Sequence, residues 1–171
     1  LVAGVDVSVN ALSEATAVVI VLDYPELTIR EKSVVKGRVE FPYIPGLLSF
    51  REVPLTLKAC EKLKLQPDLV MVDGQGIAHP RGIGLASHLG LFLEIPSIGC
   101  AKSSLYGYYQ EPDKTAGSYS LIMDKQGNTL GAVLRTKSNV KPLFISIGHK
   151  IDLPSAINWV IQCCRGYRLP E

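Results

Sequence analysis

The segment DLVMVDG at residues 68–74 constrains the fold most, because it is an apolar run that ends in an aspartate and a glycine. Successive apolar side chains leave no polar face, which is typical of a parallel strand buried on both faces of a sheet. Such strands belong to α/β proteins. At 171 residues, the sequence therefore predicts one α/β domain over residues 1–171, large enough to bury its own core.

The other segments predict a central mixed β-sheet flanked by helices. Short connections between the first three strands favour an antiparallel meander, and Gly127–Asn128 predicts a hairpin turn. Pro54 predicts either a kink in the first helix or its true start. We expect strands at 1–9, 14–24, 27–35, 68–74, 97–101, 118–124, 129–136 and 143–149, and helices at 46–64, 83–94 and 153–165.

Composition excludes several classes of protein. A hydrophobic content of 47% and a charged content of 20% are typical of a folded globular chain. No apolar run is long enough to span a membrane, and the first residues lack the basic start and cleavage site of a signal peptide. The cysteines show no CxxC spacing and the histidines are scattered far from them, which favours reduced thiols, a cytoplasmic location and no zinc site.

Charge is unevenly distributed along the chain. Residues 1–75 contain 8 Lys or Arg against 10 Asp or Glu, whereas residues 76–171 contain 10 against 6. The second half is therefore the basic one, and RTKSNVK at 135–141 is a candidate loop for facing an anion. A solvated surface turn explains those lysines equally well.

Three acidic residues occupy positions from which they can meet. Asp6 lies within the first strand, Asp73 ends the buried strand, and Glu52 lies on the first helix. Sites in open α/β sheets gather beyond the carboxyl ends of the strands. Clustered carboxylates repel one another unless a cation offsets them, and oxygen-only ligands favour Mg²⁺ or Mn²⁺. Alternatively, Asp6 forms a turn, Asp73 caps the glycine-rich loop, and Glu52 pairs with Arg51 on the surface.

Several motifs resemble the endonuclease V family, in order and over nearly the whole chain. They are GVDVS with Asp6, PYIPG followed by FRE with Glu52, VDGQGIAHPRGIGLASH with Asp73, GCAKS with Lys102, and ISIGH. The resemblance implies a ribonuclease H-like fold and a nuclease directed at inosine. Family members usually have residues before the first strand and after the motif RLPE, so we expect the family's N- and C-terminal extensions to be lacking in this chain.

The resemblance also implies roles for individual residues. Asp6, Glu52 and Asp73 match the metal-binding catalytic carboxylates, with Mg²⁺ as cofactor and Mn²⁺ as a substitute. The family's histidine and lysine, here His79 and Lys102, face the active site and the nucleic-acid backbone. Arg81 and Lys102 are expected to bind phosphate, Tyr43, Ile44 and Pro45 to form a wedge in the duplex, and Gly46, Leu48, Gly76, Ala101 and Leu105 to form the base pocket.

Two histidines are left without such a role. His88, in the middle of the second predicted helix, is expected to be a core histidine with satisfied hydrogen bonds. His149 follows a strand end and receives no assignment.

These features predict a Mg²⁺-dependent endonuclease of DNA repair. It would recognise deoxyinosine and cut the second phosphodiester bond 3′ to the lesion, leaving a 3′-hydroxyl and a 5′-phosphate. We expect a monomer that binds inosine-containing DNA and no membrane. The alternatives are an endoribonuclease for inosine-containing RNA and a non-catalytic inosine- or nucleic-acid-binding module. An actin-like or sugar-kinase-like ATPase is disfavoured, because a chain of this length lacks a second phosphate-binding repeat.

Overall fold

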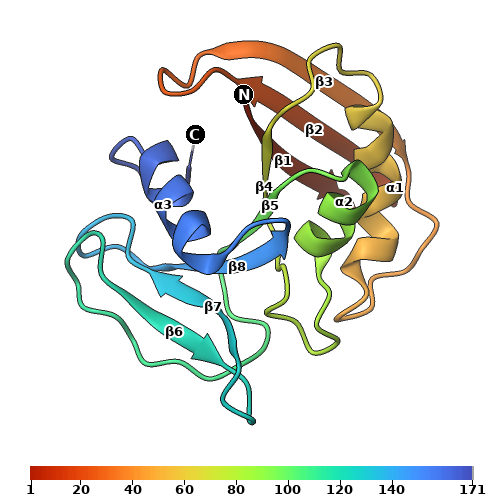
Figure 1. Cartoon of the computed structure of the whole chain (residues 1–171). Coiled ribbons are helices and arrows are strands. Elements are labelled where there is room, and N and C mark those ends of the chain that lie inside the picture. Colours follow the sequence, from red (N-terminus) through yellow and green to blue (C-terminus); the bar gives the residue numbers. More distant parts are fainter. Residues whose placement is uncertain (171) are drawn as a thin grey trace.

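The chain forms an α/β sandwich around one mixed sheet (Figure 1). The computed structural model describes residues 1–170. In this part of the chain the sheet has eight strands in the order β3-β2-β1-β4-β5-β8-β7-β6. The strands are β1 Val2–Val9, β2 Glu14–Leu22, β3 Ile29–Arg38, β4 Leu69–Val72, β5 Ser97–Ala101, β6 Tyr119–Met123, β7 Thr129–Leu134 and β8 Leu143–His149, and the helices are α1 Leu48–Cys60, α2 Leu85–Leu93 and α3 Leu153–Cys163.

Strand pairing confirms the predicted mixture of directions. β1, β2 and β3 form the antiparallel meander, β1, β4 and β5 are parallel neighbours, and β8, β7 and β6 continue the sheet in antiparallel order. All four residues of β4 are buried, as the apolar run predicted. Two crossover helices, α1 and α2, connect the parallel part.

The helices cover the two faces unequally (Figure 1). α1 and α2 pack on one face, where Ala3 and Val5 of β1 join a core that includes Leu89 of α2. α3 packs on the other face, mainly over β7 and β8. Side chains alternate along a strand, so Asp6 points to the opposite face from Val5. The face beside Asp6 is the one that α3 covers only in part.

α1 differs from the prediction at both ends. It begins at Leu48 and ends at Cys60, whereas the pattern predicted 46–64, and it runs through Pro54. Pro54 therefore does not mark the start of the helix. Its side chain is exposed, so water can hydrate the carbonyl group that the missing N–H leaves free. α1 has 13 residues, and no helix within residues 1–170 is long and apolar enough to cross a membrane.

The predicted hairpin turn lies between β6 and β7. The Asp124 carboxylate accepts hydrogen bonds from the backbone N–H groups of Gln126 and Asn128 at 2.9 and 2.8 Å. Gly127 has a φ of 85°, a left-handed conformation that glycine adopts without steric cost. The turn therefore depends on an aspartate as well as on the Gly–Asn pair.

Candidate active site

Three carboxylates meet at the end of the sheet where β4 finishes. Asp6 is the fifth residue of β1, and Asp73 directly follows β4. Val5 lies opposite Val72 in the parallel ladder, and the Asp73 N–H donates to the Val5 carbonyl at 3.2 Å. This register places Asp6 and Asp73 on adjacent strands, as predicted, and Glu52 approaches from α1.

Glu52 is the buried member of this group, with only 9% of its surface exposed. Burial raises the pKa of Glu52 to about 7, and the charges of Asp6 and Asp73 act in the same direction while Arg51 opposes them. Because Glu52 is buried, the alternative of a surface ion pair between Glu52 and Arg51 is wrong. Glu52 is a carboxylate held close to two others at a cost that a cation would offset.

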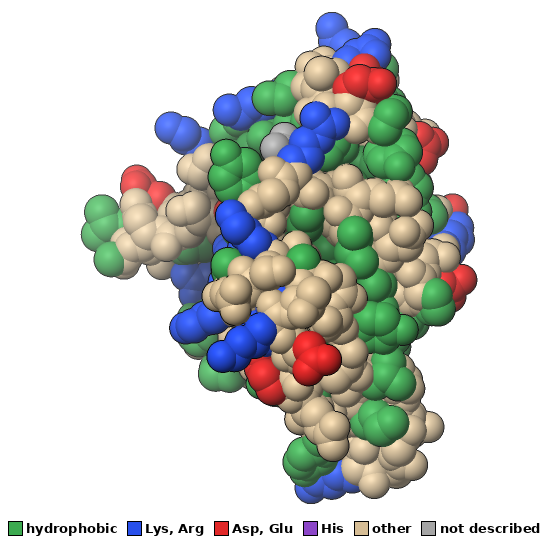
Figure 2. Space-filling model, turned by 90° about the vertical axis from the view of Figure 1, so that its left-hand side faces the viewer, with side chains coloured by type: hydrophobic (Ala, Val, Ile, Leu, Met, Phe, Trp, Pro, Cys, Tyr) green, Lys and Arg blue, Asp and Glu red, His purple; other side chains and the backbone are tan. Residues whose placement is uncertain are grey.

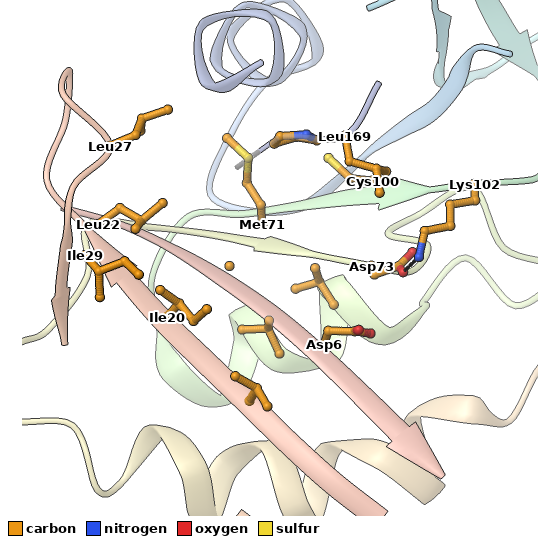
Figure 3. Close-up of a pocket in the computed structure, with 15 residues that line it drawn as sticks. Asp6, Ile20, Leu22, Leu27, Ile29, Met71, Asp73, Cys100, Lys102 and Leu169 are labelled. Atoms are coloured by element: carbon orange, nitrogen blue, oxygen red, sulfur yellow. Dashed lines mark hydrogen bonds and ion pairs between the residues drawn. The ribbon is translucent and has the colours of Figure 1, made fainter. Parts of the chain in front are cut away.

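Asp73 is paired with Lys102, which follows β5. The Lys102 ammonium group donates a hydrogen bond to a carboxylate oxygen of Asp73 (Figure 3). This hydrogen bond is the main reason why the pKa of Lys102 is raised. The ion pair crosses between neighbouring parallel strands, so the predicted carboxylates and the predicted lysine share one site.

The carboxylate oxygens of Asp6, Glu52 and Asp73 are suitable ligands for a hard divalent cation, although their side chains do not converge on a single position in this structure. Within residues 1–170, no group of three acidic, histidine or cysteine side chains has the spacing of a metal site. Asp73 directs one oxygen to Lys102, and Asp6 accepts a hydrogen bond from the Val7 N–H at 2.9 Å. Oxygen-only donors are the ligands that Mg²⁺ and Mn²⁺ prefer. A bound cation would offset the burial and the like charges that raise the pKa of Glu52.

A cleft of about 460 Å³ adjoins these carboxylates. Asp6, Asp73 and Lys102 form its polar end (Figure 3). Its other walls are mainly apolar and include Ile20, Leu22, Leu27, Ile29, Met71, Cys100 and Leu169. Apolar walls lower the local dielectric and strengthen the electrostatic interactions at the polar end.

The loop before α1 projects into solvent. Tyr43 is 67% exposed and Ile44 is 41% exposed, so Tyr43 does not pack beneath the loop. The Arg51 guanidinium lies 5.9 Å from the centre of the Tyr43 ring, and Phe41 packs against Phe50 at 5.8 Å. The predicted wedge residues are therefore accessible, and they are anchored to the first turn of α1.

His79 and Arg81 fasten this loop instead of contacting the carboxylates in this structure. His79 is buried, and its Nδ1 accepts a hydrogen bond from the Arg81 N–H at 3.1 Å. Arg81 Nη1 donates to the Gly46 carbonyl at 3.2 Å. Burial is the main cause that lowers the pKa of His79. Their predicted roles toward nucleic acid remain predictions.

The five residues predicted for the base pocket lie in three loops, at the start of α1 and at the end of β5, and none of them lines the 460 Å³ cleft. Gly46 has a φ of +77° and lies beside the His79 ring. Gly76 is required by packing, because a Cβ there would lie 1.9 Å from the Ile147 carbonyl oxygen. Ala101 is buried, Leu105 is 46% exposed and Leu48 is partly buried. Their predicted role in base recognition stays a prediction.

The expectation for His88 is wrong. Its side chain is only partly buried, and its Nδ1 is buried without a hydrogen-bond partner among residues 1–170. The ring contacts Phe50 edge-on at 5.8 Å, so α2 presents it to α1 and not to the core of the sheet.

The candidate anion-facing loop at 135–141 is also only partly available. Arg135 is buried and donates to the Glu111 carboxylate at 2.8 Å and to the carbonyls of Asp113, Val140 and Pro112. Lys137 and Lys141 are exposed. Figure 2 shows Lys and Arg side chains gathered on one part of the side that carries β6 and α3. The lysines, and not Arg135, can therefore meet an anion.

Sequence reasoning missed two residues beside Lys102. Gln75, 8% exposed, donates from Nε2 to the Ser103 carbonyl at 2.9 Å. Arg168 donates from Nη2 to the Lys102 carbonyl at 3.0 Å. Both hydrogen bonds join residues that are far apart in the sequence, so no local pattern predicts them. The signal that the sequence offered was the position of Gln75 in the motif VDGQG and of Arg168 in the motif RLPE.

Comparisons with known proteins agree on one family. Residues 1–171 match the family model described as Endonuclease V. The Endonuclease V of Dehalococcoides mccartyi strain BAV1 is 55% identical over 172 residues, which cover 100% of this chain and 77% of that protein. The crystal structure of Endonuclease V from Streptomyces avermitilis has a TM-score of 0.93 and 40% identity, and covers 99% of this chain and 74% of that one.

A third comparison includes nucleic acid. The crystal structure of Ciona intestinalis Endonuclease V, in complex with a 24mer DNA containing an inosine followed by a ribo-adenosine, has a TM-score of 0.83 and 28% identity. The match covers 99% of this chain and 79% of that one.

The mixed sheet and its flanking helices define an α/β protein with a ribonuclease H-like fold, as predicted. The chain belongs to the endonuclease V family.

Proposed function

We propose that this protein is a metal-dependent endonuclease of DNA repair that recognises deoxyinosine. It hydrolyses the second phosphodiester bond 3′ to the lesion and leaves a 3′-hydroxyl and a 5′-phosphate. The observation that carries the proposal is the meeting of Asp6, Glu52, Asp73 and Lys102 at one end of the sheet, with Glu52 buried and its pKa raised to about 7. Such an arrangement is costly for folding and is retained where it serves chemistry.

The carboxylates would hold Mg²⁺, or Mn²⁺ in its place. A bound divalent ion in such a site lowers the pKa of a water and stabilises charge on the leaving oxygen. In the hydrolysis, a water oxygen forms a bond to phosphorus, the bond from phosphorus to O3′ breaks, and O3′ takes up a proton. Lys102 would stabilise the negative charge of the pentavalent phosphorus, once Asp73 is released to the cation.

The exposed loop before α1 would contact the duplex at the lesion. Flipping a base costs a few kcal/mol of unstacking, and an aromatic side chain that is already exposed can fill the gap. Tyr43 fits this role because it is 67% exposed and its loop is tied to Arg81 through Gly46. Arg81 and the exposed lysines of the second half would contact phosphates, which makes binding depend strongly on salt.

The substrate assignment has support from a relative. The Ciona intestinalis protein was crystallised with inosine-containing DNA. Inosine-containing RNA is the second candidate substrate, because that DNA carries a ribo-adenosine directly after the inosine. We expect the protein to act as a monomer in the cytoplasm.

The proposal is tested with an end-labelled duplex that contains one deoxyinosine, incubated with the protein and Mg²⁺. We expect one nick at the second phosphodiester bond 3′ to the lesion, absent with EDTA and absent from a duplex with adenine at that position. The Glu52→Gln variant serves as the matched control.

Other outcomes separate the alternatives. Cleavage only of an inosine-containing RNA strand would establish an endoribonuclease. A gel shift of the inosine duplex without any cut in Mg²⁺ or Mn²⁺ would indicate a binding module. Absence of both binding and cutting would contradict the proposed function.

A further inference from the structure

The Arg168 side chain forms a clasp between three segments near Lys102. Its guanidinium donates to the carbonyls of Lys141 at 2.8 Å, Pro142 at 2.9 Å and Lys102 at 3.0 Å. The Arg168 carbonyl in turn accepts from the Thr136 hydroxyl at 2.6 Å. These three partners of the guanidinium are all backbone carbonyls, so the side chain holds main-chain groups in place.

Arg168 binds the chain directly after the end of β5, where the hydrogen bonds of the sheet end. The ladder between β5 and β8 ends with Ala101 opposite Phe144, and Lys102 is the next residue. Its carbonyl lies just beyond the last paired residue, and Arg168 supplies the donor. A carbonyl with a fixed partner confines the backbone from which the long Lys102 side chain starts.

A second donor, from another segment, binds the following carbonyl. Gln75, in the loop after Asp73, donates to the Ser103 carbonyl at 2.9 Å. Two consecutive carbonyls after β5 are thus bound by side chains, one from the loop after β4 and one from the segment after α3. The Lys102 ammonium group, on this segment, donates to the Asp73 carboxylate.

We propose that Arg168 is a positioning residue that fixes the segment carrying Lys102, so that Lys102 is aligned for phosphodiester cleavage. The inference rests on the proposed function for its catalytic part. Arg168 also brings Leu169 and Pro170 to the wall of the 460 Å³ cleft that Lys102 lines. Arg168 itself does not line that cleft, and it acts through the segments that it binds.

The first test measures how firmly the segment after β5, residues 102–107, is held, and it does not depend on cleavage. Hydrogen–deuterium exchange is compared in wild type, Arg168→Gln, Arg168→Lys and a control, Arg165→Gln. Arg165 lies on the same segment and donates to the Pro25 carbonyl at 2.6 Å, far from β5 in sequence. We expect exchange in peptides covering residues 102–107 to rise at least about fivefold in both Arg168 variants and to remain unchanged in the control.

The second test is a double-mutant cycle on single-turnover cleavage of the inosine duplex. Arg168→Gln should slow cleavage about tenfold at saturating protein, within the range found for residues that orient catalytic groups. In a Lys102→Met background, the same change should slow cleavage less than about twofold, because its effect passes through Lys102. Arg168→Lys should behave as Arg168→Gln, since lysine keeps the charge but lacks the planar fork.

Each contrary outcome overturns the inference. Unchanged exchange at 102–107 would show that Arg168 does not fix the segment. An equal loss of rate in both Lys102 backgrounds, or full activity of Arg168→Lys, would assign Arg168 to general stability or to its charge. Weaker duplex binding with an unchanged rate at saturation would assign it to phosphate binding. An inactive wild type contradicts the proposed function and with it the catalytic part, whereas exchange still decides whether Arg168 fixes the segment.

Discussion

The carboxylate end of the sheet and the loop before α1 are held in opposite ways. Asp6 and Asp73 occupy adjacent strands in fixed register, and Glu52 is 9% exposed. Tyr43 in the loop is 67% exposed, and near α1 the loop is held from elsewhere in the chain by the hydrogen bond from Arg81 to the Gly46 carbonyl. The first region is fixed by the sheet and by burial, whereas the second is presented to solvent.

This difference separates two tasks that a lesion-directed nuclease must perform. Hydrolysis requires charged groups at fixed positions in a site of low dielectric, which strand ends and buried helix faces provide. Opening a duplex requires an apolar side chain that is accessible before binding. We therefore expect substitutions at the sheet end to reduce the chemical step, and substitutions in the loop to reduce lesion recognition.

The largest effect is expected from Glu52→Gln. Loss of the buried carboxylate should lower the single-turnover cleavage rate by about a thousandfold or more, equivalent to ~4 kcal/mol in the activation free energy. Binding of the inosine duplex in Ca²⁺, measured by fluorescence anisotropy, should change less than about threefold. A rate within tenfold of wild type would remove Glu52 from the chemistry.

Lys102→Met comes next. Removal of a cation that stabilises the charge developing on phosphorus should slow cleavage by about a hundredfold, with little change in duplex affinity. The control is Lys150→Met, because the Lys150 ammonium donates to the Glu94 carbonyl and does not line the cleft. Equal losses in both variants would indicate a nonspecific charge effect.

Tyr43→Ala should show the reverse pattern. Loss of stacking should weaken selective binding of the inosine duplex over an undamaged duplex by about tenfold. The melting temperature should be unchanged, because Tyr43 is exposed. Tyr43→Phe, which keeps the ring, is expected to retain selectivity. Unchanged selectivity of Tyr43→Ala would contradict the wedge assignment.

The smallest effect concerns stability without divalent ions. The pKa of Glu52 is raised from 4.5 to about 7 on folding, so the folded state binds this proton more tightly than the unfolded state. Stability therefore falls as pH rises from 4.5 to 7 and is constant on either side of that range. Below pH 4.5 the neutral carboxyl carries no electrostatic cost, and above pH 7 the charged carboxylate is a constant penalty.

Glu52→Gln removes that penalty. At pH 8 in EDTA the variant should be more stable than wild type by about 1–2 kcal/mol in urea unfolding, after allowance for partial solvent screening. The advantage should disappear near pH 4.5, and other titrating groups such as His79 cancel in the difference. A variant that is less stable at pH 8 would show that Glu52 is not under electrostatic repulsion.

The sequence predicted the sheet and the carboxylates well because both depend on local pattern. The apolar run of β4 identified a buried parallel strand, and Asp73 at its end could then lie beside Asp6 within the neighbouring strand β1. Glu52 was placed correctly by its position at the start of α1, although only the structure shows that it is buried.

Residues whose function depends on distant partners could not be predicted in this way. The Lys102–Asp73 pair joins residues 29 positions apart, and the Arg168 bond to Lys102 spans 66 positions. His88 was expected in the core because it lies in the middle of the second predicted helix, but the packing of α1 on α2 places it against Phe50. Arg135 was expected in a loop that faces an anion, but residues 111–113 supply three acceptors and Val140 of its own loop supplies a fourth.

The central claim is that Asp6, Glu52 and Asp73 form a divalent-cation site at the end of the sheet. The most direct measurement is a Mn²⁺ titration at pH 8, in which electron paramagnetic resonance follows the signal of free Mn²⁺ for wild type and for the Asp6→Asn/Glu52→Gln double variant. We predict that wild type removes Mn²⁺ from solution saturably and that the double variant does not, while both keep the same circular dichroism spectrum. Equal Mn²⁺ binding by the two proteins would contradict the account.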